Sequence, residues 1–160
     1  MTEANRRLVI GCDHAAYPLK EQLKGFLLES GYKVEDVGTH DDASVDYPRF
    51  GAMVAAKVSS GEFQRGILLC GTGLGMSMVA NRFPHVRAAL CGDLFSAIMS
   101  RKHNDANILV LGGRVIGQTL AEEVVKTWLQ TPFEGGRHQD RLEQFDSLER
   151  MNFPESGEEK

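Results

Sequence analysis

A chain of 160 residues, of which 42% are hydrophobic and 25% charged, is long and apolar enough to form one domain with a buried core. Its net charge of −4 gives no general attraction to nucleic acid, and its N-terminal region lacks the long apolar stretch of a signal peptide or membrane span. The three cysteines form no CxxC pair, which argues against a disulfide framework and a structural zinc site. We expect one cytoplasmic domain over residues 1–150, without nucleic-acid or membrane partners, and a frayed polar tail over residues 151–160.

Short apolar runs alternate with helical patterns along the chain. The runs are rich in β-branched residues, as strands buried on both faces should be, and lie at residues 7–12, 33–37, 65–70, 87–90 and 108–111. Apolar residues at helical spacing lie between and after them, at Leu19, Leu23, Phe26 and Leu27, at residues 94–102, at Leu120, Val124 and Trp128, and at Leu142, Phe145 and Leu148. The alternation predicts an α/β fold with an open, parallel five-stranded sheet and helices on both faces.

Ligands of such sheets bind beyond the carboxyl ends of the strands. Three polar or glycine-rich segments follow predicted strands, and we expect Asp13-His14, residues 71–75 and residues 101–107 to meet at this edge. The sharpest signal is Cys70-Gly71-Thr72-Gly73-Leu74-Gly75, with a helical stretch from Met76. Backbone N–H groups in such a loop form an anion site and favour the reactive thiolate of Cys70. The alternative is a buried structural cysteine before a tight turn.

Two other motifs fail on spacing. A dinucleotide fingerprint needs its third glycine one place later than Gly75. A cysteine phosphatase loop has an arginine six positions after the nucleophile, where this chain has Met76.

Further candidate site residues also have purely structural explanations. Asp13 and His14 project into the same crevice or form a helix cap with a surface histidine, and Tyr47-Pro48 forms a contact or an ordinary helix start. His103-Asn104 ends the helix at 94–102, which suits either C-capping or acid–base work.

Several arginines could bind a phosphate. Arg114 follows Gly112-Gly113, and Arg137 and Arg141, four residues apart, share one helical face. Taken alone, such a pair usually marks a solvated helix face. The whole set nevertheless contains a base, an anion loop, a ring-opening acid and phosphate clamps, which together one reaction needs.

The motifs match a known family in order. They are GCDHAA at 11–16, DYP at 46–48, CGTGLG at 70–75, AN at 80–81, RKHNDAN at 101–107, GGRV at 113–116 and EGGRHQDR at 134–141. In this combination, over residues 7–150, the chain resembles ribose-5-phosphate isomerase type B, whose relatives include allose-6-phosphate and galactose-6-phosphate isomerases. The resemblance implies a three-layer, Rossmann-like aldose–ketose isomerase of the pentose phosphate pathway that needs no metal or other cofactor.

The resemblance also implies roles for residues. Cys70 looks like the base, Thr72 its helper, Asp13 a contact to the ring oxygen or hydroxyls, and His103 the ring-opening residue. The loop that stabilises the enediolate looks like Gly71, Gly73, Leu74 and Gly75 of this chain. The other residues that resemble the family's substrate contacts are Tyr47, His14, Asn104, Arg114, Arg137 and Arg141. A subgroup of the family has a glutamate base at the position of Met76, so this chain resembles the cysteine subgroup.

We further expect a homodimer with shared active sites, and a dimer of dimers stays open. In this hypothesis one chain supplies Asp13, His14, Cys70 and the glycine loop. Its partner supplies His103, Asn104, Arg114, Arg137 and Arg141. Two other functions remain open, namely a six-carbon sugar phosphate as substrate and a non-catalytic module that binds phosphate or nucleotides. We find no sequence cluster with metal-ligand spacing and expect no metal site.

Overall fold

The computed structural model describes residues 6–152, the side chains of 146–152 excepted. The strands are β1 (Arg7–Cys12), β2 (Lys33–Asp36), β3 (Gly66–Cys70), β4 (Ala88–Leu90) and β5 (Ile108–Gly112). The helices are the short 3₁₀ turn η2 (His14–Ala16), α1 (Tyr17–Glu29), α2 (Tyr47–Ser59), α3 (Leu74–Ala80), α4 (Leu94–Lys102), α5 (Gln118–Gln130) and α6 (Arg137–Asn152). Each predicted strand is present with bounds shifted by one residue at most, while α3 begins two residues before Met76.

The strands form one parallel sheet in the order β2-β1-β3-β5-β4, as the alternating pattern predicts. The interior strands β3 and β5 are buried along their whole length, which explains their uninterrupted apolar sequences. Cys70 pairs with Gly112 at the carboxyl edge of these two strands, and Gly66 pairs with Ile108 at the amino edge.

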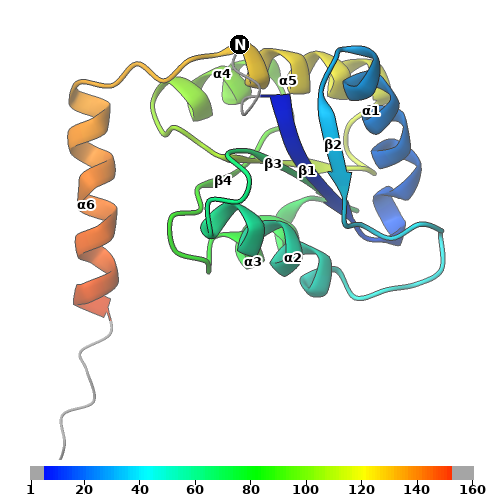
Figure 1. The fold of residues 1–160 in the computed structure, drawn as a ribbon, viewed down its shortest axis with the longest axis horizontal. Coiled ribbons are helices and arrows are strands. Elements are labelled where there is room, and N and C mark those ends of the chain that lie inside the picture. The colour runs from blue at the N-terminus through cyan, green and yellow to red at the C-terminus, as the bar shows by residue number, and fades with distance from the viewer. Residues whose placement is uncertain (1–5, 153–160) are drawn as a thin grey trace, which may run out of the picture.

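Helices cover both faces of the sheet (Figure 1), and successive strand residues belong to the two different cores between them. On one face Leu8 and Ile10 pack with α1, α4 and α5, where Trp128 is fully buried. On the other face Val9 and Cys70 pack with α2 and α3. The fold is therefore three-layered, and its two apolar cores fix the register of every strand.

Helix α6 stands apart from these three layers, at the side of the molecule where β4 forms the edge of the sheet (Figure 1). It extends to Asn152, two residues into the tail that we expected to fray, and residues 153–160 lie outside the described part of the chain. None of the described helices is long and apolar enough to cross a membrane.

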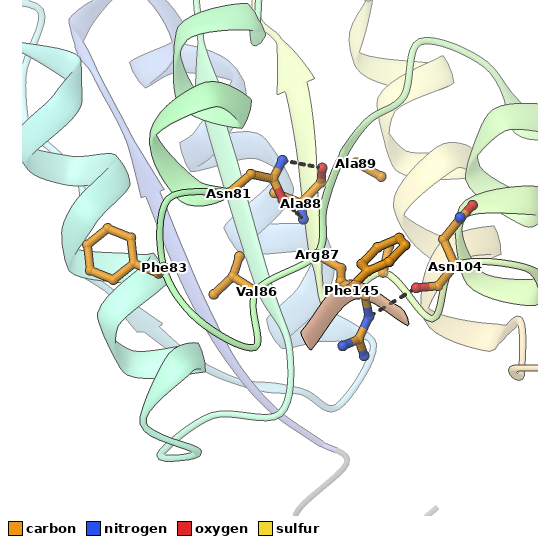
Figure 2. A pocket seen from close by; sticks show the side chains of 9 residues that line it. Asn81, Phe83, Val86, Arg87, Ala88, Ala89, Asn104 and Phe145 are labelled. Carbon is orange, nitrogen blue, oxygen red and sulfur yellow. Dashed lines mark hydrogen bonds between the residues drawn. The ribbon is translucent and has the colours of Figure 1, made fainter. Parts of the chain in front are cut away.

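The side chain of Asn81 occupies backbone hydrogen-bonding groups of the edge strand β4. Asn81 donates to the backbone oxygen of Ala88 at 2.9 Å and accepts from its N–H at 2.8 Å, as Figure 2 shows. These two bonds replace those of a neighbouring strand. The Ala-Asn motif at 80–81 thus has a structural explanation that needs no contact with a ligand.

Candidate active site

Cys70 ends β3 at the carboxyl edge of the sheet, with only 5% of its surface exposed. Its sulfur accepts a hydrogen bond of 3.2 Å from the N–H of Gly73. Gly73 has a φ of 81°, a left-handed conformation that favours glycine, and so the loop can turn its N–H back toward the thiol. The loop thus directs one backbone donor at the thiol, and its role as an anion site stays a prediction.

Thr72 and Tyr47 complete the loop. The Thr72 hydroxyl accepts from the N–H of Leu74 at 3.3 Å, so it stabilises the turn, and both side chains are exposed. The Tyr47 ring lies against Gly75, where a Cβ atom would approach it to 2.6 Å. Only glycine therefore allows the first residue of α2 to pack on the loop at this point.

Asp13 and His14 lie next to this loop because β1 pairs with β3. The N–H of Asp13 donates to Leu69 at 3.3 Å, and the buried carboxylate of Asp13 caps η2 by accepting from Ala15 at 3.0 Å. His14 accepts from the N–H of Val45 at 3.1 Å through Nδ1. This bond leaves Nε2 as the nitrogen that can donate to a ligand when the ring is neutral.

A buried lysine holds the loop on which Val45 lies. Lys20 Nζ, fully buried, donates to Asp36 Oδ2 at 2.7 Å and to the carbonyl of Thr39 at 2.9 Å. Burial alone would raise the pKa of the Asp36 carboxyl, but hydrogen bonds from Lys20 and Lys24 bring it below its usual value. The N–H of Thr39 in turn donates to Cys12 at 3.1 Å, so this network fastens the loop to the end of β1. Sequence reasoning missed it because Lys20 reads as an ordinary surface position of an amphipathic helix.

Arg114 belongs with the Cys70 loop of its own chain, which corrects the expected division of residues between two chains. Its N–H donates to the carbonyl of Gly71 at 2.9 Å, and its Nε lies 3.9 Å from where a Cβ atom of Gly71 would be. The reason is the pairing of β3 with β5, which brings the turn after Gly112 beside the turn after Cys70.

His103 and Asn104 do not join this set, and the expectation that residues 101–107 lie at the carboxyl edge is wrong. Helix α4 starts after the carboxyl end of β4 and returns to the amino end of β5, so its last residues reach the opposite edge. The carbonyl of Asn107 accepts from Gly66, the first residue of β3, at 2.9 Å. With about 3.3 Å per residue, β5 alone separates the two edges by about 13 Å. His103 therefore cannot reach Cys70 of the same chain.

At the amino edge His103 meets two residues that the sequence did not single out as site residues. The rings of His103 and His138 stack with centroids 4.1 Å apart and planes inclined by 10°. Glu134 Oε2 lies 4.0 Å from His103 Nε2 and 3.8 Å from His138 Nε2. The four-residue interval from Glu134 to His138 was readable in the sequence, but His103 is too distant in the chain for any spacing rule to connect it.

The charges of this cluster are set by its neighbours. The hydrogen bond from Lys102 lowers the pKa of Glu134, and the ion pair between them measures 2.9 Å. Desolvation, with the nearby charges of His103, Arg137 and Arg141, lowers the pKa of His138. At neutral pH the carboxylate is thus ionised and His138 is neutral.

Arg137 and Arg141 are exposed at the start of α6 and belong to the amino edge. A cavity of about 400 Å³ lies between the body and this helix, lined by Phe145 of α6 and by residues including Asn81, Ala88 and Asn104 (Figure 2). It does not include Cys70. Within one chain, the predicted residues thus form two groups at opposite edges of the sheet.

Cys12 was the other thiol beyond a strand end. Burial raises its pKa to about 12, so at neutral pH it stays protonated and is a poor base. The high pKa argues against Cys12 as the reactive cysteine.

The fold and these groups define an open parallel α/β enzyme domain with its reactive groups beyond the strand ends. The chain matches the Ribose/Galactose Isomerase family model over residues 8–145, and it belongs to this family of isomerases.

Relatives of known name agree over nearly the whole chain. Ribose-5-phosphate isomerase B of Escherichia coli (strain K12) is 44% identical over 144 residues, which cover 90% of this chain and 97% of the relative. D-erythrulose-4-phosphate isomerase of Pectobacterium atrosepticum is 42% identical over 138 residues, or 85% and 90% of the two chains. The structure of ribose-5-phosphate isomerase B from Clostridium thermocellum superposes with a TM-score of 0.89 at 51% identity, covering 91% of this chain and 99% of that one.

Proposed function

We propose that this isomerase interconverts ribose-5-phosphate and ribulose-5-phosphate through an enediolate, as an enzyme of the pentose phosphate pathway in the cytoplasm. The names of the E. coli and C. thermocellum relatives support the substrate. The observation that carries the chemistry is the 3.2 Å contact of the Gly73 N–H with Cys70 Sγ, which joins a base to an anion-binding loop. The three cysteines are free and buried, which suits a reducing compartment.

In the proposed mechanism the Cys70 thiolate removes a proton from the carbon next to the carbonyl and returns it to the neighbouring carbon. The carbon acid is weak, so the oxyanion needs strong stabilisation, and loop N–H donors are typically worth about 3 kcal/mol each. Asp13 and Thr72 would contact sugar hydroxyls, and His103 would open the furanose ring. His14 and the arginines would hold the phosphate and orient the open chain.

The active site is proposed to be shared between two chains. Cys70 and His103 lie at opposite edges of the sheet in one chain, about 13 Å or more apart, so a single chain cannot supply both to one sugar. Large apolar side chains on α3, β4 and α4 are exposed, with Met78 at 65% and Phe95 at 73%. An isologous dimer through this side would bury them and could bring the amino edge of each chain to the carboxyl edge of the other.

This proposal assigns Asp13, His14, Tyr47, Cys70, the glycine loop and now Arg114 to one chain. It assigns His103, Asn104, Arg137 and Arg141 to the partner. A dimer of dimers is compatible with the same contacts.

A four-carbon sugar phosphate is the second candidate substrate, because the P. atrosepticum relative is named for D-erythrulose-4-phosphate and matches 85% of this chain. The family description also includes galactose, which keeps the six-carbon alternative. All of these reactions use the same proton transfer, so the choice depends on the length of chain between the carbonyl and the phosphate.

The test is a direct assay of the purified full chain with ribose-5-phosphate, D-erythrulose-4-phosphate, allose-6-phosphate and galactose-6-phosphate at equal concentrations. We expect the highest kcat/KM with ribose-5-phosphate. A higher kcat/KM with another sugar phosphate would change the proposed substrate but not the proposed mechanism. Binding of all four without turnover would instead support the non-catalytic phosphate-binding module.

A further inference from the structure

The cluster of His103, Glu134 and His138 holds three metal-ligating groups. One ligand atom of each side chain lies within 4.8 Å of the other two. Two imidazoles and a carboxylate are the donor set of many zinc sites, and they also suit cobalt and nickel. Sequence spacing did not indicate this cluster, because the fold joins segments 31 residues apart in the sequence.

The two carboxylate oxygens of Glu134 have different neighbours. Oε1 pairs with Lys102 at 2.9 Å, and the backbone N–H of Glu134 donates to the carbonyl of Lys102 at 3.1 Å. Oε2 faces both imidazole Nε2 atoms instead. The end of α4 therefore holds the glutamate in place while leaving one oxygen free to act as a ligand.

Only small movements are needed to close the site. Around a tetrahedral ion with bonds of about 2.0–2.1 Å, neighbouring ligand atoms lie about 3.3 Å apart. The two distances from Glu134 are 4.0 and 3.8 Å, and all three ligand atoms lie within 4.8 Å of one another. The stacked rings must also tilt so that their lone pairs converge. The side chain of His103 is 39% exposed and can rotate toward Glu134, whereas His138 is buried and fixed.

The charges around the three side chains limit how tightly they can hold a cation. Lys102, Arg137 and Arg141 are nearby cations that oppose a second positive charge. We therefore expect reversible binding, weaker than in a structural zinc site.

We propose that His103, Glu134 and His138 bind one divalent transition-metal ion of the zinc type per chain, leaving at least one coordination position open. We also propose that the bound ion inhibits isomerisation, because it occupies Nε2 of the histidine that is to open the sugar ring. This second statement rests on the proposed function, and the first does not.

The test for binding is a titration of metal-free full-length protein with Co²⁺, followed by visible absorption, and then displacement by Zn²⁺. Wild type should bind one ion per chain, and Cys70→Ala should bind equally, which excludes that thiol as a ligand. Glu134→Gln and His138→Gln should each bind about tenfold more weakly or worse. His85→Asn is the matched control, because it removes an exposed histidine at a position with a φ of 62°, which asparagine tolerates.

Equal affinity in wild type and Glu134→Gln, with both proteins folded by circular dichroism, would overturn the site. So would the absence of a Co²⁺ spectrum in wild type. Glu134 is exposed, so its replacement should not prevent folding.

The inhibition is tested separately by isomerase assays with Zn²⁺ and subsequent EDTA. We expect loss of wild-type turnover at saturation, full recovery with EDTA, and weaker inhibition of whatever activity Glu134→Gln retains. Binding without inhibition would refute the regulatory statement alone. If the metal-free enzyme turns over none of the sugar phosphates, the proposed function fails, while the Co²⁺ titration still decides the metal site.

Discussion

The two edges of the sheet hold their polar groups in different ways. At the carboxyl edge, Cys70 and Asp13 are buried and fixed by backbone hydrogen bonds between adjacent strands and turns. At the amino edge, Arg137 and Arg141 are exposed on a helix outside the three layers, reached through Gly135 and Gly136 with φ values of 64° and 55°. The first group is held by the fold of one chain, whereas the second lies on an element outside the layers. In the proposed shared site, the carboxyl edge supplies the base and the amino edge supplies the ring-opening histidine and two of the phosphate contacts.

The largest expected effect is the loss of the base at the carboxyl edge. Cys70→Ala should lower kcat about a thousandfold with little change in KM, because the thiolate acts on the carbon acid and adds little to ground-state binding. Steady-state assays with ribose-5-phosphate measure this. Cys91→Ala, which removes another buried thiol, should keep its kcat, and retention of most activity by Cys70→Ala would disprove the assignment.

Mixing a variant that is inactive at the carboxyl edge with one that is inactive at the amino edge tests whether the two edges meet across a dimer interface. Cys70→Ala and Arg141→Ala, each inactive alone, should recover about a quarter of wild-type activity after dissociation and random reassociation. Half of the dimers are then mixed, and each mixed dimer has one intact site. No recovery, with mixed dimers detected by mass spectrometry, would place both residues in one chain's site.

Replacing His103 at the amino edge should affect only the ring-opening step of the reaction. His103→Asn should reduce kcat about a hundredfold with cyclic ribose-5-phosphate, and less with open-chain ribulose-5-phosphate, since only the first substrate needs its ring opened. The equilibrium constant fixes the ratio of the two kcat/KM values, so the asymmetry must appear in kcat. Equal losses of kcat in both directions would indicate a structural histidine at the end of α4.

The stability of the two edges should also differ. Lys20→Met leaves the Asp36 carboxylate, whose side chain is only 10% exposed, with fewer partners at the carboxyl edge. It should cost about 3 kcal/mol of unfolding free energy in urea at pH 7. The exposed control Lys126→Met should change it by about 0.5 kcal/mol at most.

Lowering the pH tests the same contact between Lys20 and Asp36. Because the pKa of Asp36 is lowered on folding, its contribution is present above the unfolded pKa near 4 and is lost as the pH falls through the folded value. The difference between Lys20→Met and wild type should therefore shrink in urea titrations repeated at successively lower pH. A difference that stays constant would show that Asp36 is not involved.

The smallest expected effect is that of chelation. EDTA should leave the turnover of metal-free, freshly purified enzyme unchanged, because the proposed proton transfer uses a thiolate and backbone N–H donors. Loss of activity that only added metal restores would make the His103, Glu134 and His138 cluster a catalytic centre.

Local patterns of the sequence determined much of this protein. The five runs predicted the strands to within one residue. For β1, β3 and β5 the reason is burial on both faces, which requires nearly uninterrupted apolar residues. The loop after Cys70 was also predictable from local sequence, because a strand end, three glycines and a helix start are adjacent in the chain.

Only the tertiary structure decided which residues meet. The direction of α4 carries His103 to the amino edge, the pairing of β3 with β5 brings Arg114 to Gly71, and the chain after α5 brings Glu134 and His138 to His103. No spacing rule reports these contacts, because they depend on the order of strands and the course of the connections. Local sequence fixes which groups a segment carries, whereas the packing of distant segments into two cores fixes where those groups point.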